Sequence, residues 1–509
     1  MYRLVIWFAE TSEVLVYRKY TTIKSGWSAG TVIGAASGTG VGSLFHGGLP
    51  GQRIDFLLFL SPEAALPVVP ALPFSTRRFA MKDKIRTLVD SQREEILTTL
   101  CDLIAINTVN PYAGGKILGS EKAGQDYLEP RCREIGLKTR RAEVRPNVYQ
   151  EAGVLGPVPR DFSGRENLVA EMDFGGEGPH LLLFAHMDTV GVDSMSIPPF
   201  EPRRSDGRIY GRGASDDKSG ITVAFHALKA LLETGIPRCG RITFASVVDE
   251  ECDGGGAGIM SLCLEGLKPD AAICLDGSSS FIARGCSGCA TGRITVPGIS
   301  AHAAGSGGVS ALEKALVIKD ALDAYGHRRA ESTPDAPLTI GVFRAGQHPA
   351  MVPGSAEMLF NLVYHQREAE AAQSRGHGFT GGFLRRDLES VVQGAAARDP
   401  FLAENPPQTS WVKDLPPYCT GNDSPVLQRL RAVAEEIRGE SVEVRIAPYW
   451  TDASIFALST GRDVVNFGSG AGCAHSPDEY VEVETILRQT EILTCFLADV
   501  FRNGRPLLP

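Results

Sequence analysis

Potential metal-binding side chains follow three apolar segments of this chain, at the point where each segment ends. The segments are residues 181–185, 242–248 and 271–275, and the residues that follow them are His186, Asp188, Glu250, Glu251 and Asp276. Imidazole nitrogens and carboxylate oxygens are the usual protein ligands of zinc and similar divalent ions. Such chemistry gathers beyond the carboxyl ends of parallel strands. The pattern therefore predicts a metal site at one edge of a sheet.

Two glycine-rich loops carry further residues of the same types. Gly211–Gly220 contains Asp216 and Asp217, and Gly468–Ala474 leads into His475. Two zinc ions a few ångströms apart need imidazole and carboxylate ligands, with one carboxylate shared between them. Acidic groups buried at strand ends would be costly without a cation. A further carboxylate, free of metal, is needed to take a proton from water.

Each of these motifs has an ordinary structural explanation when it is taken alone. A His-x-Asp is commonly a hydrogen-bonded surface pair, an Asp-Glu-Glu a solvated strand exit, and a Gly-Arg-Gly-Ala a turn. A His-Ser-Pro-Asp-Glu stretch can cap a short helix. Their joint order, each at the end of an apolar strand or in a glycine-rich loop, favours the metal site over these separate explanations.

The elements that must position these residues alternate along the chain. From residue 165 onward, short apolar runs alternate with helical patterns. This alternation is typical of a largely parallel sheet covered by helices. We therefore expect an α/β fold in which a mostly parallel sheet carries the metal site at its edge.

These motifs resemble those of the dinuclear zinc peptidase and deacylase family of acetylornithine deacetylase, succinyl-diaminopimelate desuccinylase and glutamate carboxypeptidase, over about residues 81–509. The resemblance implies one metal site of His186, Asp216 and Asp276 and a second of Asp216, Glu251 and His475, bridged by Asp216. It also implies that Asp188 orients His186 and that Glu250 is the general base and later the acid. Zinc is favoured by the ligand types, with cobalt and manganese as alternatives.

A further match is the segment Gly298–Ala304, which contains His302. In the family this histidine lies on an inserted lid domain and stabilises the tetrahedral intermediate, often in the neighbouring subunit of a dimer. The resemblance implies the same role for His302, although a histidine packed in the lid is the ordinary alternative. It implies a lid and dimerisation domain at 290–402, inserted in a catalytic domain of residues 81–289 and 403–509, and a homodimer through the lid.

The sequence departs from the family pattern at positions that bear on substrate binding. Ala350 precedes Met351-Val352-Pro353 where the family often has Asn, and aromatic Tyr449 and Trp450 stand where glycines are frequent. We expect a hydrolase of the amide bond in a small N-acyl amino acid, as in acetylornithine deacetylase. A dipeptidase or carboxypeptidase of the same mechanism, a related aminopeptidase and a non-hydrolytic metal-dependent ligand-binding protein are the alternatives.

Composition limits the other classes of function. The chain has 509 residues, a formal net charge of -9 and eleven scattered cysteines. The acidic balance argues against nucleic acid as a partner, no run is long enough to span a membrane, and scattered cysteines fit a reducing cytoplasm. Residues 1–80 differ in amino-acid composition from the rest of the chain. We expect them to be a poorly ordered extension or an over-long start, with the enzyme proper beginning near Met81.

Overall fold

The structure is a computed structural model that describes residues 81–502 with their side chains, apart from residues 158, 253 and 375–379, and also residues 506–507. Before residue 81 it describes backbone elements only. These include two antiparallel pairs, β1 (Tyr2–Ala9) with β2 (Ser12–Lys19) and β3 (Gly42–Gly47) with β4 (Ile54–Phe59). The chain divides into two compact units, Met1–Arg77 and Arg78–Pro509. The expected extension of residues 1–80 lies mostly outside the described residues and stays a prediction.

A nine-stranded sheet forms the centre of the larger unit. Its strand order is β19-β12-β21-β11-β7-β10-β6-β5, with β20 also paired to β12. The inner strands β21, β11, β7 and β10 run parallel, and β6 and β5 are added antiparallel. This arrangement confirms the predicted α/β fold class. The strands are β5 (Lys138–Glu143), β6 (Glu166–Gly175), β7 (His180–His186), β10 (Gly240–Val247), β11 (Ala271–Cys274), β12 (Phe281–Cys286), β19 (Tyr418–Cys419), β20 (Glu443–Ala447) and β21 (Asp463–Asn466).

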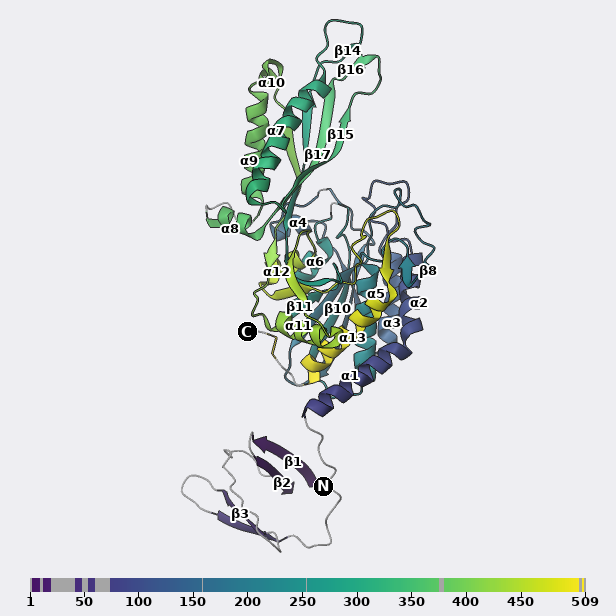
Figure 1. Cartoon of the computed structure of the whole chain (residues 1–509), viewed down its shortest axis with the longest axis vertical. Coiled ribbons are helices and arrows are strands. Elements are labelled where there is room, and N and C mark those ends of the chain that lie inside the picture. The colour runs from purple at the N-terminus through teal and green to yellow at the C-terminus, as the bar shows by residue number, and fades with distance from the viewer. Residues whose placement is uncertain are drawn as a thin grey trace. The chain divides into compact units, whose positions relative to one another are not determined.

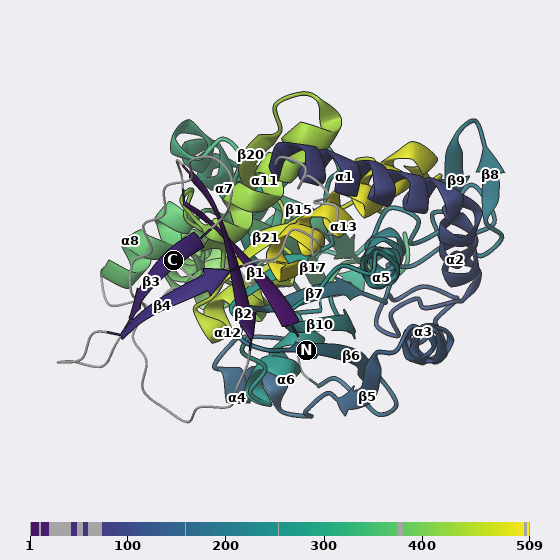
Figure 2. The ribbon, with the colours of Figure 1, turned by 90° about the horizontal axis from the view of Figure 1, so that it is seen from below.

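Helices cover both faces of this sheet (Figures 1 and 2). One face packs against α1 (Phe74–Ser91), α2 (Arg93–Ala105), α3 (Lys122–Glu134), α5 (Lys218–Glu233), α11 (Pro425–Arg438) and α13 (Val483–Arg502). The other packs against α4 (Val148–Ala152), α6 (Ala257–Leu264) and α12 (Ala453–Thr460). Leu181 and Leu183 of β7 enter the first core, and Leu182 and Phe184 enter the second. Both faces are buried, which is why β7 is a continuous apolar run.

Residues 288–415, which we call the lid, are inserted between β12 and β19. A four-stranded antiparallel sheet of order β15-β17-β13-β18 packs against the helices α7 and α9 around a core of its own (Figure 1). The last strand of the lid lies entirely after residue 402, where we expected the insert to end. The elements are β13 (Gly288–Pro297), α7 (Ala311–Ser332), β15 (Leu338–Ala345), β17 (Ser355–Tyr364), α8 (Gln366–Ser374), α9 (Gly382–Ala396), α10 (Pro400–Glu404) and β18 (Gln408–Leu415).

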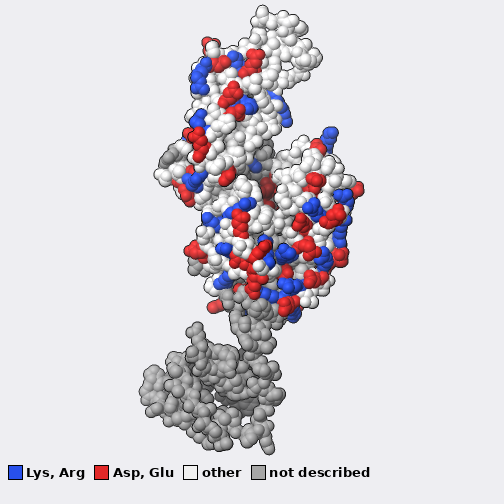
Figure 3. All heavy atoms as spheres, viewed as in Figure 1, with Lys and Arg blue, Asp and Glu red and all other residues white. Residues whose placement is uncertain are grey.

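The outer end of the lid is a short ribbon of β14 (Ala301–His302) and β16 (Met351–Val352). Its two segments, residues 298–309 and 346–356, contain no Lys, Arg, Asp or Glu. Charges of both signs intermingle on the rest of the lid and around the nine-stranded sheet in the view of Figure 3, where this outer end is uncharged. Among the helices that the structure describes, none has the length and apolar character needed to cross a membrane. The expected cytoplasmic location stays a prediction.

A small three-stranded sheet of β8 (Arg203–Ser205), β9 (Arg208–Tyr210) and β22 (Tyr480–Glu482) lies apart from the central sheet. Tyr480 pairs with Tyr210 in antiparallel register. This pairing ties the segment that follows His475 to the segment that precedes Asp216, although the two are far apart in sequence.

Candidate active site

The carboxyl ends of three inner strands carry predicted ligands to the same edge of the sheet. His186 is the last residue of β7 and lies in register with Val247, the last residue of β10. Glu250 and Glu251 follow within four residues of that point. Asp276 follows β11, which pairs in parallel with β7 on its other side. The sequence pattern therefore corresponds to one edge of one sheet.

Asp216 and His475 come from the two glycine-rich loops. Asp216 lies just before α5, and its neighbour Asp217 caps that helix by accepting a hydrogen bond from the Gly220 amide at 3.2 Å. His475 has a φ of 63°, in the left-handed region, so the chain turns sharply at this residue. Both side chains reach the strand ends from loops and not from regular elements.

The structure brings together all five predicted metal ligands and Glu250. Nε2 of His186 lies 2.8 Å from Oδ1 of Asp216, and Nε2 of His475 lies 3.3 Å from Oδ2 of Asp216 and 3.0 Å from Oε1 of Glu251. Ligand atoms lie within 4.8 Å of one another in three groups. These groups are His186, Asp216 and Asp276; Asp216, Glu251 and His475; and His186, Glu250 and Glu251. The first two have the composition of the two ligand sets that the resemblance implied.

The buried acids of this cluster are costly without a cation. Burial, reinforced by the charge of Asp216, raises the pKa of Asp276 to about 7. Burial likewise raises the pKa of Glu250 well above its usual range, with the charge of Glu251 adding to the effect. For His475, burial opposes protonation, but hydrogen bonds with Asp216 and Glu251 outweigh it and raise the pKa to about 11. When no divalent ion is bound, protons on these groups therefore offset part of the negative charge of the carboxylates.

The donor set therefore fits two divalent ions. It offers two imidazole nitrogens and three carboxylates, with Asp216 common to both groups. Mixed nitrogen and oxygen ligands of this kind suit zinc and its neighbours among the divalent metals. Cations would also remove the electrostatic cost that raises the pKa values of Asp276 and Glu250.

The geometry fixes which nitrogen of His186 faces the cluster. Nδ1 lies 2.9 Å from the main-chain oxygen of Asp188. Because a carbonyl oxygen can only accept, Nδ1 carries the proton and the lone pair of neutral Nε2 is free for a metal. The carboxylate of Asp188 is 3.8 Å from Nδ1, and it accepts hydrogen bonds from the amides of Glu250 and Glu251 at 3.3 and 3.0 Å. Asp188 thus contacts both His186 and the turn that follows β10.

Two residues beside this turn were not found by sequence reasoning. Nδ2 of Asn110 donates to Oδ2 of Asp188 at 2.8 Å, and Nη1 of Arg160 donates to Asp249 at 2.6 Å. Asp249 has a φ of 66° and is fully buried, and its Oδ1 accepts from Arg160 and, at 3.3 Å, from Nδ2 of Asn110, so both residues help to hold this turn. The sequence offered no signal for either contact, because the partners are 78 and 89 residues apart.

A pocket of about 290 Å³ opens onto the cluster. Its lining includes the carboxylates and His475 of the cluster together with Tyr449 and Trp450. Among the lining residues that the structure describes, none is a lysine or an arginine. His302 does not line this pocket. It lies at the outer end of the lid, beyond the ten-residue strand β13, which spans roughly 30 Å.

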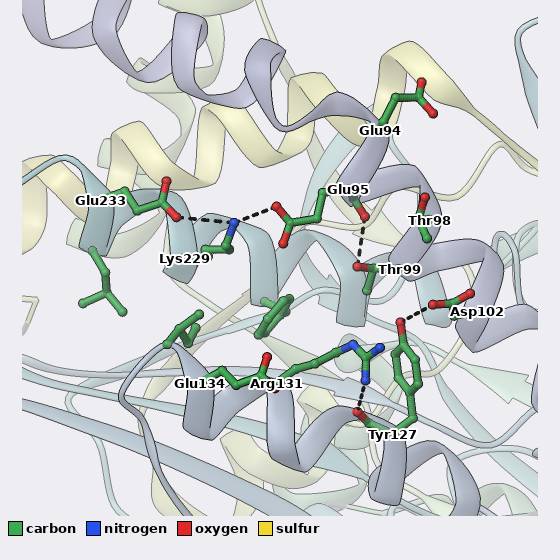
Figure 4. Close-up of a pocket in the computed structure, with 13 residues that line it drawn as sticks. Glu94, Glu95, Thr98, Thr99, Asp102, Tyr127, Arg131, Glu134, Lys229 and Glu233 are labelled. Carbon is green, nitrogen blue, oxygen red and sulfur yellow. Dashed lines mark hydrogen bonds and ion pairs between the residues drawn. The ribbon is translucent and has the colours of Figure 1, made fainter.

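A larger hollow of about 750 Å³ lies elsewhere, between α2, α3 and α5 (Figure 4). Several of its polar groups already have partners within it. Lys229 contacts both Glu95 and Glu233, and the hydroxyl of Tyr127 donates to Asp102 at 2.8 Å. None of the predicted catalytic or metal-binding residues lines it. The smaller pocket at the strand ends is therefore the candidate active site.

The fold and this site define a dinuclear metallohydrolase with a lid. A family model described as peptidase family M20/M25/M40 matches residues 182–499, and the chain belongs to this family. The resemblance stated from the sequence is thereby confirmed, as is the expectation of an enzyme that hydrolyses amide bonds.

Named relatives include deacylases and a peptidase. The chain is 27% identical over 452 residues to N-formyl-4-amino-5-aminomethyl-2-methylpyrimidine deformylase of Halalkalibacterium halodurans, covering 82% of this chain and 97% of the relative. It is 27% identical over 348 residues to acetylornithine deacetylase of Salmonella arizonae, covering 66% and 84%. A tripeptidase structure from Staphylococcus aureus shares the fold, with a TM-score of 0.59, 21% identity, and coverage of 79% and 97%. The chain is a metal-dependent amide hydrolase.

Proposed function

We propose that the chain removes a short acyl group from the nitrogen of a small N-acyl amino acid, using two metal ions and Glu250. The observation that carries this proposal is the position of Glu250. Its carboxylate lies within 4.8 Å of ligand atoms of His186 and Glu251, yet it belongs to neither of the two ligand sets bridged by Asp216. A carboxylate beside a metal pair but outside its ligand sets is what a general base requires.

The ions proposed here are zinc, held by His186, Asp216 and Asp276 at one position and by Asp216, Glu251 and His475 at the other. When bound, they would lower the pKa of a water molecule and polarise the carbonyl oxygen of the amide. Cobalt and manganese are alternatives that metal analysis decides. The role of Asp188 is to hold His186 and the turn of Glu250 and Glu251 in place.

In this mechanism Glu250 removes a proton from the attacking water as it adds to the amide carbon. Glu250 then donates the proton to the nitrogen of the departing amine as the C–N bond breaks. His302 of a second chain donates a hydrogen bond to the negative oxygen of the tetrahedral intermediate.

The role of His302 requires a homodimer, and the lid offers a surface for one. On α7, the apolar side chains of Leu312, Leu316 and Val317 are 41%, 45% and 39% exposed. Exposed apolar residues that cluster on one element mark an interaction surface. The ribbon that carries His302 has no acidic or basic residue, so it can approach a buried acidic pocket without burying an unpaired charge.

A second substrate class is favoured by the walls of the pocket. Tyr449 and Trp450 offer aromatic surfaces, and no described lining residue is a lysine or an arginine that would pair with a substrate carboxylate. An N-formyl or N-acetyl aminomethyl group on an aromatic ring matches these walls, and the deformylase relative is named for such a pyrimidine. A dipeptide is the third class, with the same chemistry.

A substrate panel tests these proposals. The panel compares N-acetyl and N-succinyl amino acids, N-formyl and N-acetyl aminomethyl-pyrimidines, and dipeptides, with zinc or cobalt added. We expect the highest kcat/KM for an acylated small amine. A higher kcat/KM for dipeptides would instead indicate a peptidase. Preference for the pyrimidines over the amino acids would favour the second class.

A further inference from the structure

Glu479 lies four residues after His475 and holds the loop that carries Asp216. Its carboxylate is fully buried and accepts four hydrogen bonds. Oε2 accepts from Nη1 of Arg212 at 2.6 Å and from the Gly213 amide at 3.2 Å. Oε1 accepts from the amides of Ser215 and Asp216 at 2.8 and 3.1 Å. All four donors belong to residues 212–216, so one carboxylate fixes the backbone of this loop up to Asp216 itself.

The main chain around Glu479 is tied to the same region. Its carbonyl oxygen accepts from the Gly211 amide at 3.0 Å, and the carbonyl of Pro477 accepts from the Ser196 amide at 2.8 Å. Glu479 thus follows His475 by four residues in the chain and accepts a hydrogen bond from the Asp216 amide. Glu479 therefore links the loop that carries Asp216 to the segment that follows His475, beside the hydrogen bond from the Ala471 amide to the Ser215 hydroxyl.

His475 has few other anchors. Its side chain is 53% exposed, and its backbone follows a loop of small residues, Gly468–Ala474. The contacts of its ring that the structure describes go to Asp216 and Glu251, which are its proposed fellow ligands. The loop before it is held by hydrogen bonds from the Gly470 amide to Gly277 and from the Ala471 amide to Ser215, and the segment after it is held by Glu479.

Stability alone explains this arrangement poorly. Arg212 is 1% exposed, and its Nε and Nη2 atoms are buried without a hydrogen-bond partner in the part of the chain that the structure describes. Burying unpartnered donors costs free energy, and buried ion pairs are often no more stable than apolar replacements. The benefit of this pair lies instead in the fixed direction of its hydrogen bonds.

We propose that Glu479 is a positioning residue that sets the distance between Asp216 and His475, and thereby the affinity for the metal ion shared by Asp216, Glu251 and His475. The inference rests on the proposed two-metal site. The other ion also uses Asp216, but its further ligands His186 and Asp276 have no contact with Glu479 that the structure describes, so we expect its affinity to fall less when Glu479 is changed. Partners behind metal ligands typically contribute about 10–100-fold in metal affinity.

The test compares zinc affinities of the purified full chain and its variants, measured by competition with a chelator and by metal analysis after dialysis. Glu479→Asp keeps the charge but shortens the side chain, and Glu479→Gln keeps the length but loses the charge. Glu368→Gln is the matched control, because Glu368 accepts from Arg329 at 2.9 Å and from the His365 amide at 2.9 Å within the lid, away from the cluster.

We expect both Glu479 variants to bind one zinc ion about 10–100-fold more weakly than the wild-type chain, with excess zinc restoring two ions per chain. Glu368→Gln is expected to lose thermal stability without losing zinc affinity. The inference is overturned if Glu479→Asp binds both ions as tightly as the wild type, or if it weakens both ions equally. Should Glu479→Gln fail to fold, Glu479→Asp alone decides the question.

Amide hydrolysis by the wild type is measured separately. A wild-type chain that bound two ions but cleaved nothing would refute the proposed function and leave the affinity comparison valid. A wild-type chain that bound fewer than two ions would overturn the inference together with the two-metal site.

Discussion

His186 points Nε2 at Oδ1 of Asp216 across 2.8 Å, while its Nδ1 is held at 2.9 Å by the main chain of Asp188. The main chain that follows β7 thus orients the ring of His186, and this ring contacts Asp216, which lies 30 positions later in the chain. Oδ2 of Asp216 lies 3.3 Å from Nε2 of His475. This double contact is the structural basis for assigning the bridging role to Asp216.

Replacing Glu250 by Gln should separate catalysis from metal binding. The amide cannot accept a proton from water, so we expect kcat to fall on the order of 10³-fold, the scale of a general base. Metal analysis should still find about two ions per chain, because Glu250 is outside the two ligand sets that share Asp216. Glu265→Gln, which changes a glutamate paired with Arg140 at 3.1 Å, is the control and should retain activity. Near-normal turnover by Glu250→Gln would refute the base assignment.

The two ligand sets should be separable by mutation. Replacing His475 by Ala removes a ligand of one proposed ion, and replacing Asp276 by Ala removes a ligand of the other. Each variant should retain about one ion per chain after dialysis against a weak chelator, and their metal content should fall further in the double variant. Loss of both ions in each single variant, or of neither, would contradict two sites bridged by Asp216.

Zinc affinity should rise with pH. In the absence of an ion, the pKa of His475 is raised to about 11 and that of Asp276 to about 7, so both groups hold protons that a metal must displace. Each released proton makes the affinity rise by about tenfold per pH unit. His475 contributes across the whole range below its pKa, whereas the contribution of Asp276 ends above pH 7.

Chelator competition between pH 6 and 9 measures this dependence, with the pH range set by the two pKa values. The slope should be steeper below pH 7 than above it, and His475→Ala should reduce it by about one proton. A pH-independent affinity would show that neither group is a ligand.

The lid surface of α7 should control the oligomeric state. Leu316→Asp places a charge on the exposed apolar surface of this helix, and we expect sedimentation to show monomers where the wild type shows dimers. Activity should fall with the dimer, because His302 is proposed to act in the neighbouring chain. Leu458→Asp is the matched control, since Leu458 is 46% exposed on α12. An unchanged dimer in Leu316→Asp would move the interface elsewhere.

The sequence predicted those parts of the site that follow from strand ends. His186, Asp276 and the Glu250-Glu251 pair each follow a continuous apolar run, and such runs form the buried parallel strands of the sheet. The fold class and the family were predicted correctly for the same reason. Asp216 and His475 lie in glycine-rich loops that the sequence showed, but their assignment as ligands came from the family resemblance.

The parts that escaped prediction depend on contacts across long stretches of chain. Glu479 binds the Asp216 amide from 263 positions away, and Arg160 reaches Asp249 from 89 positions away. Neither contact leaves a periodic or compositional pattern, because each depends on how two loops meet after the sheet has formed. The partner of His302 also cannot be derived from one chain, since its proposed role is in a second copy.

Metal analysis of the purified chain, combined with amide hydrolysis before and after metal removal, tests the central claim most directly. We predict about two zinc ions per chain, loss of hydrolysis of N-acyl substrates when a chelator removes them, and recovery when zinc or cobalt is restored. Two bound ions with no cleavage of any N-acyl compound or dipeptide would instead indicate a metal-dependent ligand-binding protein. Full hydrolysis by a metal-free chain would contradict the two-metal mechanism altogether.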